Sequence, residues 1–295
     1  MSHNPTVNLT NCLCIVVSFN PDKALHGRLK KLIELFQFVL VVDNSYKPEH
    51  YKNLTTYTTG LGLTIIRNTE NLGLGKALNQ GFEYASSHGF DWCVFFDQDT
   101  EIYPSFLTSL QQCLDSLDSQ PSIIGSNYID AHAQKPRFKA QPEGAKIYRE
   151  VKTVITSGSL ISTQLYNEIG GFREDYFIDS IDHEYCLRAR KYNHKIILNT
   201  LVTMQHSLGE KRVKKGVLMS IPEHGAMRKY YIARNMAITV KAYKAHEKIW
   251  CLKQILRLVS ESLCIIFFES NKIEKLAATL KGLRHGLTGR LDAYT

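Results

Sequence analysis

Two carboxylates, one residue apart at the end of an apolar run, are the side chains in this sequence best placed to do chemistry. Asp97 and Asp99 follow five apolar residues, 92–96, whose aromatic and β-branched types predict a buried strand. The carboxyl ends of strands in an open α/β sheet face the crevice that binds ligands. Two like charges this close repel each other unless a cation lies between them, and divalent cations prefer such oxygen ligands. A polar turn would give the same Asp-Gln-Asp sequence, so the interpretation needs further support.

Polar side chains also end the other strands predicted in the N-terminal half. Ser18 and Asn20 follow or close the first apolar run, and Asp43 and Asn44 follow the second. A third short strand is predicted at residues 63–67. Helical patterns alternate with these strands at intervals of about 25–30 residues, which predicts a mostly parallel sheet covered by helices on both faces. We therefore expect an α/β fold that gathers these side chains at one edge of the sheet.

A glycine-containing junction precedes the helix that is predicted from residue 74. Asn71, Gly73 and Lys76 lie in or beside this junction. Glycines at the start of a helix let backbone amides approach an anion, and a lysine adds positive charge. A tight turn needs the same glycines, so phosphate binding and a plain turn remain alternatives.

Small and acidic residues in the second half of the sequence are candidates for binding a second ligand. Ser157 and Gly158 form a small-residue turn that admits a ligand close to the backbone, or only a tight turn. Asp182 and Glu184 begin a predicted helix, where a carboxylate caps the helix or accepts a proton from a hydroxyl group. His206 lies beyond a predicted strand and would complete a metal site, although a lone histidine seldom does. The strands predicted here are 123–129, 151–155 and 196–202, with a polar loop at 131–149.

The positive charge of the chain is concentrated in its last third. Residues 1–195 hold 19 Lys and Arg against 21 Asp and Glu, whereas residues 196–295 hold 17 against 7, a net +10. Such a region favours an anionic partner, and phosphate-bearing small molecules, acidic lipid head groups and nucleic acid all qualify.

The cysteines and the apolar segments bear on the compartment. The seven cysteines lie mostly in apolar runs and lack metal-like spacing, which indicates buried thiols in a reducing compartment. The longest strongly apolar segment, 258–268, contains Glu261 and is too short to cross a bilayer as a helix. The first residues lack the pattern of a signal peptide. We therefore expect a cytoplasmic protein.

The sequence from about residue 230 is predicted to be helical. Two apolar stripes run through it, with Lys and Arg on the other faces. Such a stripe is more often a core or dimer contact than a membrane anchor, but the basic residues favour shallow contact with the cytoplasmic leaflet. The predicted regions are an α/β domain at 1–229, with halves at about 1–100 and 101–229, and a helical region at 230–295.

The motifs described above recur in a fixed order with several others. They are Ser18-Phe19-Asn20, Val42-Asp43-Asn44, Asn71 with Gly73 and Gly75, Asp97-Gln98-Asp99, Ser157-Gly158-Ser159, Asp182 with Glu184 and Arg188, His206 with Gly209, and Tyr230-Tyr231 with Arg234 and Asn235. The ordered set, over residues 12–235, resembles inverting family 2 glycosyltransferases of the GT-A fold, and most closely their bacterial rhamnosyltransferase branch. The resemblance implies a Rossmann-like nucleotide-diphospho-sugar-binding fold with a C-terminal amphipathic helical extension.

The resemblance assigns roles in binding a nucleotide-sugar donor and a metal ion. Asp43 matches the acid that contacts the base, and Asp97 and Asp99 match the pair that meets the ribose and the metal-bound diphosphate. His206 matches a third metal ligand, and Arg234 stands where a basic residue would meet phosphate. The donor set by analogy is Ser18, Asn20, Asp43, Asn44, Asn71, Gly73, Lys76, Asp97, Asp99 and Arg234, with Mg²⁺ or Mn²⁺ held by Asp99 and His206.

The resemblance also assigns a catalytic base. Asp182 matches the carboxylate that deprotonates the acceptor hydroxyl, with Glu184 beside it. Ile181 stands where many relatives have a second acid, and Asp179 is a candidate substitute. The acceptor set by analogy is Ser157, Gly158, Asp182 and Glu184.

The activity implied by the resemblance is metal-dependent transfer of L-rhamnose from dTDP-β-L-rhamnose to a saccharide hydroxyl. The acceptor by analogy is a lipid-linked saccharide of O-antigen or capsule biosynthesis, so the enzyme would lie on the inner face of the cell membrane. A homodimer is possible, and no nucleic-acid partner is expected. A loop at 207–227, which carries Lys211, Arg212, Lys214 and Lys215, is expected to close over the diphosphate.

Two other classes of function remain. A sugar-1-phosphate nucleotidyltransferase also uses a parallel sheet and acidic metal ligands, but needs a glycine- and basic-rich loop where this chain has Asn20-Pro21-Asp22. A non-catalytic basic module that binds membrane or nucleic acid would leave the strand-end carboxylates without a role.

Overall fold

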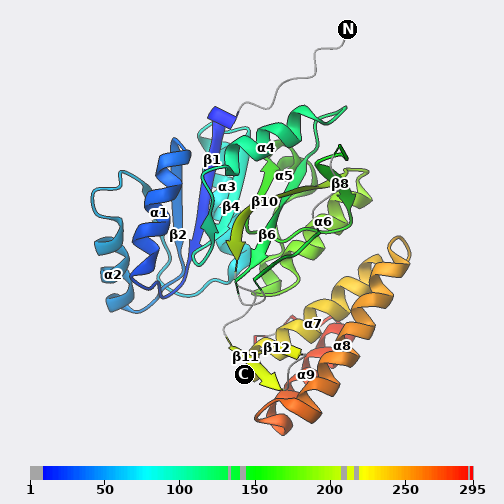
Figure 1. Cartoon of the computed structure of the whole chain (residues 1–295). Coiled ribbons are helices and arrows are strands. Elements are labelled where there is room, and N and C mark those ends of the chain that lie inside the picture. Colours follow the sequence, from blue (N-terminus) through cyan, green and yellow to red (C-terminus); the bar gives the residue numbers. More distant parts are fainter. Residues whose placement is uncertain are drawn as a thin grey trace.

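In the part of the chain that the structure describes, ten strands form one sheet with helices on both faces, and three long helices follow it (Figure 1). The structure is a computed structural model that describes residues 9–131, 134–139, 144–206, 211–215, 219–291 and 293–294. The strands of this sheet are β1 (Cys12–Ser18), β2 (Phe38–Asp43), β3 (Thr64–Arg67), β4 (Trp92–Asp97), β5 (Glu101–Ile102), β6 (Ile123–Asp130), β7 (Lys135–Pro136), β8 (Tyr148–Val151), β9 (Ser159–Ser162) and β10 (Ile196–His206). The helices are α1 (Ala24–Leu35), α2 (Pro48–Thr58), α3 (Leu74–Ser87), α4 (Phe106–Asp115), α5 (Thr163–Ile169), α6 (Ile181–Lys191), α7 (Ala226–Tyr243), α8 (Lys248–Phe268) and α9 (Lys272–Thr288), with short 3₁₀ turns at η1 (Leu9–Asn11) and η2 (Glu174–Tyr176).

The strand order confirms the predicted mostly parallel sheet. Along the order β3-β2-β1-β4-β9-β6-β10-β5, only β9 and β5 run against the other strands of this path. β1 lies between β2 and β4 and is parallel to both, so the polar groups that end these three strands meet at one edge. This is the edge at which an open α/β sheet binds its ligands.

Alternation along β1 divides the core into two layers. Cys14 and Val16 pack with the apolar sides of α1 and α4 on one face, whereas Leu13 and Ile15 pack with α3, α5 and α6 on the other. Strand side chains alternate between faces, so a strand that is apolar on both sides requires a helical layer on each. Both faces are covered, as the sequence predicts.

Three predicted elements of the second half differ in detail from the structure. The strand predicted at 151–155 is not formed: β8 ends at Val151, and Val154 fills the core beside Gly125 without strand pairing. β10 continues to His206, so the histidine is the last residue of the strand and pairs with Asp130. The segment predicted as a loop at 207–227 contains the hairpin β11 (Lys211–Lys215) and β12 (Met219–Glu223). The side chains of residues 207–222, including the four predicted lid cations, lie outside the described part.

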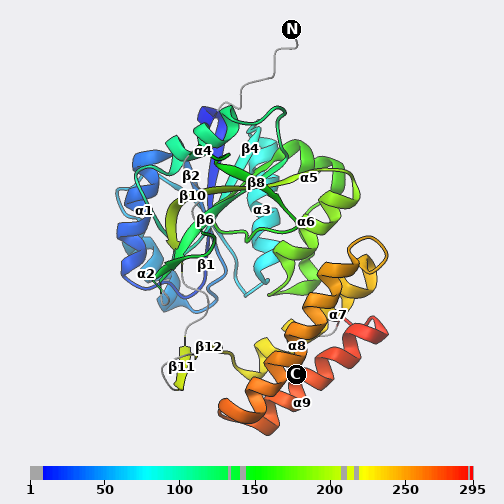
Figure 2. The same cartoon turned by 45° about the vertical axis from the view of Figure 1, so that its right-hand side comes forward.

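The three C-terminal helices lie together below the sheet (Figures 1 and 2), and the closest packing is between α7 and α9. α9 approaches α7 so closely that a Cβ atom on Gly282 would lie 2.2 Å from the carbonyl oxygen of Tyr230. Gly286 meets the carbonyl oxygen of Arg234 in the same way, at 2.4 Å. Two glycines one helical turn apart therefore set the distance between the helices. Among the described residues, no helix has the length and apolarity needed to span a membrane.

Buried ion pairs join these helices to the end of β12. Lys229 donates to Glu269 at 2.9 Å, and Lys275 donates to Glu269 at 3.0 Å and to Glu223 at 2.7 Å. Hydrogen bonds from Lys275 and Ser270 lower the pKa of Glu223 from 4.5 to about 2. Glu223 therefore stays charged above pH 4.5 and loses its stabilising contribution as the pH falls toward 2.

We predict that Lys229→Met lowers the free energy of unfolding by about 3 kcal/mol, because it removes one partner from a buried carboxylate. Chemical denaturation of the full chain measures the change. Arg257→Met is the matched control: Arg257 forms an exposed pair with Glu261 within one helix, so its loss should cost about 0.5 kcal/mol or less. Equal effects of the two substitutions would contradict the role of the buried network.

Candidate active site

A cavity of about 1110 Å³ lies where the carboxyl ends of β1 and β4 face the C-terminal helices. Its lining combines groups from three parts of the chain. The first part of the sheet contributes Ser18, Phe19, Asn44, Asn71, Gly73, Asp97, Gln98 and Asp99; the second contributes Ser157, Asp182, His183 and His206; and the last helices contribute Arg228, Trp250, Lys253 and Arg257. The predicted gathering of strand-end side chains at one site is therefore present.

Asp97, Asp99 and His206 form one cluster in this cavity. Oδ2 of Asp97 lies 3.7 Å from Nε2 of His206, and Oδ1 of Asp99 lies 3.9 Å from Nδ1. One donor atom from each residue lies within 4.8 Å of the others. Metal-ligand bonds of about 2.1 Å place two ligand atoms at most about 4.2 Å apart, so small side-chain rotations bring the three onto one ion. The oxygen and imidazole donors suit Mg²⁺ or Mn²⁺.

Two hydroxyl groups fix the imidazole of His206. Oγ1 of Thr100 lies 3.1 Å from Nδ1 of His206 and 2.7 Å from Oγ of Ser157. The Ser157 hydroxyl in turn accepts the backbone N–H of Asp97 at 3.2 Å. This relay joins β4 to the end of β10. It orients the histidine as hydrogen-bonded neighbours orient metal ligands.

Burial and neighbouring acids shape the charge of Asp97. Burial raises its pKa, and the charges of Asp99 and Asp182 raise it further, while His206 and Arg228 oppose the shift. The side chain still reaches solvent. The site therefore favours an added positive charge, because a cation beside Asp97 relieves the repulsion.

Asn44, Asn71 and Gly73 lie together at the cavity wall. The carboxamide of Asn44 donates to the carbonyl oxygen of Gly73 at 3.0 Å, and Asn71 accepts the Gly73 N–H at 3.0 Å. Gly73 has φ of 83°, and a Cβ atom there would lie 2.8 Å from Phe177. Only glycine fits this junction, which explains one glycine of the sequence motif.

Asp43 lies behind the cavity wall rather than in its lining. Burial raises its pKa, opposed first by hydrogen bonds from Ser45. The Ser45 hydroxyl donates to Asp43 at 2.7 Å and accepts the backbone N–H of Asn20 at 2.7 Å. Asp43 therefore supports the Asn20 turn, and its predicted contact with a base stays a prediction.

Gln98, which separates the two carboxylates, clasps the backbone of Phe19. Its Oε1 accepts the Phe19 N–H at 2.9 Å, and its Nε2 donates to the Phe19 carbonyl at 3.0 Å. The exposed Phe19 ring lies beside Tyr46, with ring centroids 6.4 Å apart. Gln98 therefore couples the positions of Asp97 and Asp99 to the position of the Phe19 and Tyr46 rings. Neither Gln98 nor Tyr46 is among the predicted donor-binding residues.

The loop before Asp182 is held in an uncommon backbone conformation. Phe177, Asp179 and Ser180 all have φ between 61° and 67°. The Asn235 carboxamide on α7 donates to the carbonyl oxygens of Tyr176, Ile178 and Asp179 at 2.7–2.9 Å. Such strain persists only where surrounding contacts enforce it. α7 therefore positions the loop from which Asp182 enters the cavity.

Asp179, the predicted substitute acid, is neutralised by α7. Arg228 donates to both of its carboxylate oxygens, at 3.0 and 3.2 Å. Burial raises the pKa of Asp179, Arg228 opposes the shift and Asp182 adds to it. Asp182 itself lines the cavity, and its Oδ1 accepts the backbone N–H of His183 at 2.8 Å.

Arg234 and Glu184 make structural contacts instead of the ligand contacts that were predicted. Arg234 is 1% exposed, outside the cavity lining, and donates to carbonyl oxygens of Asp175 and Leu291. Glu184 is 4% exposed, pairs with Arg188 at 2.9 Å and accepts the Tyr243 hydroxyl at 2.8 Å. Both side chains tie α6 and α7 to their surroundings, so neither is free to bind a ligand.

Lys76, Gly158 and Asn20 also lie outside the cavity lining. Lys76 pairs with Glu174 at 3.2 Å. Gly158 has φ of 75° and turns the chain behind Ser157, where a Cβ atom would lie 2.6 Å from Met204. Their predicted contacts with phosphate, acceptor or donor stay predictions.

The helices supply cavity cations that the motif analysis missed. Arg228 from α7 and Lys253 and Arg257 from α8 line the cavity beside Trp250. A signal for two of them is present in the sequence, because Lys253, Arg257 and Glu261 recur four residues apart and share one helical face. Their proximity to the acidic cluster depends on tertiary packing.

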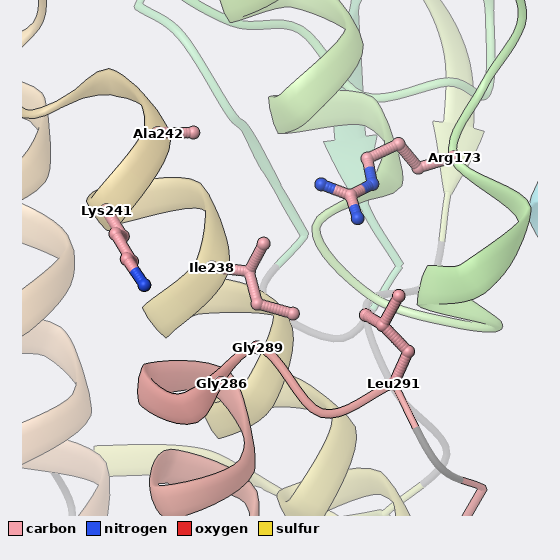
Figure 3. Close-up of a pocket in the computed structure, with 7 residues that line it drawn as sticks. All are labelled: Arg173, Ile238, Lys241, Ala242, Gly286, Gly289 and Leu291. Carbon is pink, nitrogen blue, oxygen red and sulfur yellow. The ribbon is translucent and has the colours of Figure 1, made fainter.

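A second cavity, of about 420 Å³, lies between α7, the end of α9 and Arg173 (Figure 3). Its lining is Arg173, Ile238, Lys241, Ala242, Gly286, Gly289 and Leu291. Arg173 pairs with Asp175, which offsets its charge. Its described lining contains neither a carboxylate nor a histidine.

Comparisons with known proteins agree with this geometry. The family model described as "Glycosyl transferase family 2" matches residues 13–170. The dTDP-rhamnosyl transferase RfbF of Shigella flexneri is 29% identical to this chain, over 95% of this chain and 97% of RfbF.

Two solved structures show the same fold at low identity. S. aureus TarS in complex with UDP-GlcNAc has a TM-score of 0.59 and 16% identity, over 95% of this chain and 83% of that chain. GalNAc-T7 with UDP, GalNAc and Mn²⁺ has a TM-score of 0.61 and 12% identity, over 96% of this chain and 56% of that chain. The predicted GT-A type fold, with a helical C-terminal region, is confirmed.

We predict that His206→Ala weakens Mn²⁺ binding at least about tenfold, because it removes one of three clustered ligands. Isothermal titration of the full chain with Mn²⁺ measures the affinity. His183→Ala is the matched control, since His183 lines the same cavity outside the cluster. An unchanged affinity in His206→Ala would remove the histidine from the metal site.

Proposed function

The chain belongs to glycosyl transferase family 2, and from that premise we propose that it is a metal-dependent inverting rhamnosyltransferase that uses dTDP-β-L-rhamnose. The observation that carries the proposal is one cavity lined by both the Asp97, Asp99 and His206 cluster and the separate carboxylate of Asp182. A one-step displacement of a diphosphate by a hydroxyl group requires a group that binds the donor and a base, both in the same cavity. The rhamnosyl donor is supported by the name and near full-length similarity of RfbF.

The donor side of the cavity would hold the nucleotide and its diphosphate. The exposed aromatic pair Phe19 and Tyr46 offers a face to a base, and Asn44 and Asn71 offer polar groups beside it. The UDP ligands of TarS and GalNAc-T7 support a nucleoside diphosphate in this fold. Asp99, His206 and Asp97 would hold a divalent cation, which would supply positive charge for the departing diphosphate; the Mn²⁺ of the GalNAc-T7 structure supports a divalent cation in this fold.

Asp182 would act on the acceptor. Its carboxylate takes the proton of the acceptor hydroxyl as the oxygen forms its bond to the anomeric carbon. The bond from that carbon to the diphosphate oxygen breaks, and its electron pair leaves with the dTDP. Attack opposite to the leaving group inverts the anomeric centre. The Asn235 clamp keeps Asp182 in place for this step, since reaction rates depend steeply on such positioning.

The acceptor that we propose is a lipid-linked saccharide of a bacterial surface polysaccharide, met at the inner face of the cell membrane. Arg228 and Arg257 line the helical side of the cavity in ion pairs with Asp179 and Glu261, and Lys253 adds a positive charge there that suits a phosphate-bearing acceptor. The closing motion of residues 207–227 remains part of this proposal.

The direct test is release of dTDP from dTDP-β-L-rhamnose with Mg²⁺ or Mn²⁺ and a saccharide acceptor. We expect release that depends on both acceptor and metal, and none of comparable rate from UDP-GlcNAc. Formation of pyrophosphate from dTTP and rhamnose 1-phosphate would instead identify a nucleotidyltransferase. Absence of turnover together with tight DNA binding would identify a non-catalytic basic module.

We predict that Asp182→Asn lowers kcat by about 10²- to 10⁴-fold, because the amide cannot accept the hydroxyl proton. Binding of dTDP should stay unchanged, which separates loss of the base from loss of the fold. Glu184→Gln serves as the control: this buried, ion-paired carboxylate should affect thermal stability much more than kcat. A fully active Asp182→Asn enzyme would rule out Asp182 as the base.

A further inference from the structure

One side of α8 exposes a row of apolar side chains. Each member of this row, called here the α8 seam, is between 42% and 65% exposed. The seam consists of Ile249, Leu252, Leu256, Val259, Leu263 and Ile266. The opposite side of α8 is buried at Trp250, Cys251 and Ile265. Figure 2 shows α8 in front of α9, on the outer side of the three helices.

The spacing of the seam is that of a helix that pairs with another helix. Successive members lie 3, 4, 3, 4 and 3 residues apart, a period of 3.5 residues. This period keeps one line of side chains facing a partner helix along its length, with the exposed Ile255 and Phe267 flanking it. From Ile249 to Ile266 the line extends about 26 Å.

We propose that the α8 seam binds the α8 seam of a second copy of this chain, with the two helices antiparallel. The seam is symmetric about the midpoint between residues 257 and 258, as a two-fold axis perpendicular to the helices requires. Antiparallel pairing then makes three kinds of apolar layer: Ile249 against Ile266 of the second copy, Leu252 against Leu263, and Leu256 against Val259. Every seam residue meets another apolar residue.

The charges beside the seam favour this direction. In a parallel pair, Lys248 of each copy would lie beside Lys253 of the other copy. The pair would therefore contain two repulsive lysine contacts. In the antiparallel pair, Lys253 faces Ser260 of the second copy and Ile255 faces its Ser262. The antiparallel pair therefore avoids the lysine contact without losing any apolar layer.

The helix that forms the proposed dimer contact, α8, also lines the active-site cavity. The cavity is lined by Ile249 from the seam and by Lys253, Gln254 and Arg257 beside it. A second copy on the seam would fix the helix that forms this wall, because it adds a partner along nearly the full length of α8. The inference concerns association of the chain and does not depend on which sugar is transferred.

The test is the mass of the full chain in detergent-free solution, measured by sedimentation or by light scattering after gel filtration. We expect about twice 33.6 kDa for the wild type. Leu256→Glu and Val259→Lys should each give monomers, because each buries an unpaired charge in the central layer. An equimolar mixture of the two variants should restore the dimer, since the new acid faces the new base across the pair. Leu280→Glu, at an equally exposed leucine on α9, should leave the dimer intact.

A cysteine pair tests the direction with milder substitutions. In a Cys264→Ser background, oxidation of a mixture of Leu252→Cys and Leu263→Cys chains should cross-link them, and neither variant alone should do so. Cross-linking of each variant with itself would contradict the antiparallel arrangement. A wild type that is monomeric at all concentrations, yet sediments with anionic vesicles unless Leu256 is changed to Glu, would overturn the proposal in favour of membrane contact. A wild type that stays monomeric and does not bind vesicles would also overturn the proposal.

Discussion

Mutual repulsion among acidic side chains in one cavity is the constraint on which the rest of the structure depends. Asp97, Asp99 and Asp182 all line that cavity, and the charges of the last two help raise the pKa of the first. His206 from the end of β10 and Arg228 from α7 oppose this rise in the pKa of Asp97. A site with an excess of carboxylates attracts a divalent cation, and with it an anionic ligand such as a diphosphate. The acidity and the preference for a phosphate-bearing donor are therefore two consequences of one arrangement.

The C-terminal helices complete the site rather than merely follow it. Asn235 holds a loop of left-handed residues that delivers Asp182, and Arg228 neutralises Asp179 beside it. Buried ion pairs and two close-packed glycines hold α7, α8 and α9 as one unit. The position of Asp182, the proposed base, thus depends on packing more than 50 residues away in sequence. This dependence also explains why α8, whose inner side lines the cavity, matters for the geometry of the reaction.

The sequence predicted what parallel strands dictate and missed what only packing decides. The strand ends at Asp43 and Asp97 were predictable, because parallel strands bring their carboxyl ends to one edge. The strand prediction for residues 151–155 was wrong because apolar residues can fill a core from a loop as well as from a strand. Val154 does so here. Membership of a motif did not reveal that Arg234 is buried against backbone carbonyls. The contact of Lys253 with the cavity has no local signal beyond its helical face, since it joins segments far apart in the chain.

The most direct measurement of the central claim is the rate of sugar transfer from dTDP-β-L-rhamnose in the presence of a chelator, before and after Mn²⁺ is added back. If the acidic cluster exists to hold a cation against the diphosphate, transfer by the wild-type chain stops in chelator and returns with Mn²⁺, whereas Asp99→Ala stays inactive at the same Mn²⁺ concentration. Transfer at full rate in chelator, by the wild type and by Asp99→Ala alike, would contradict the account.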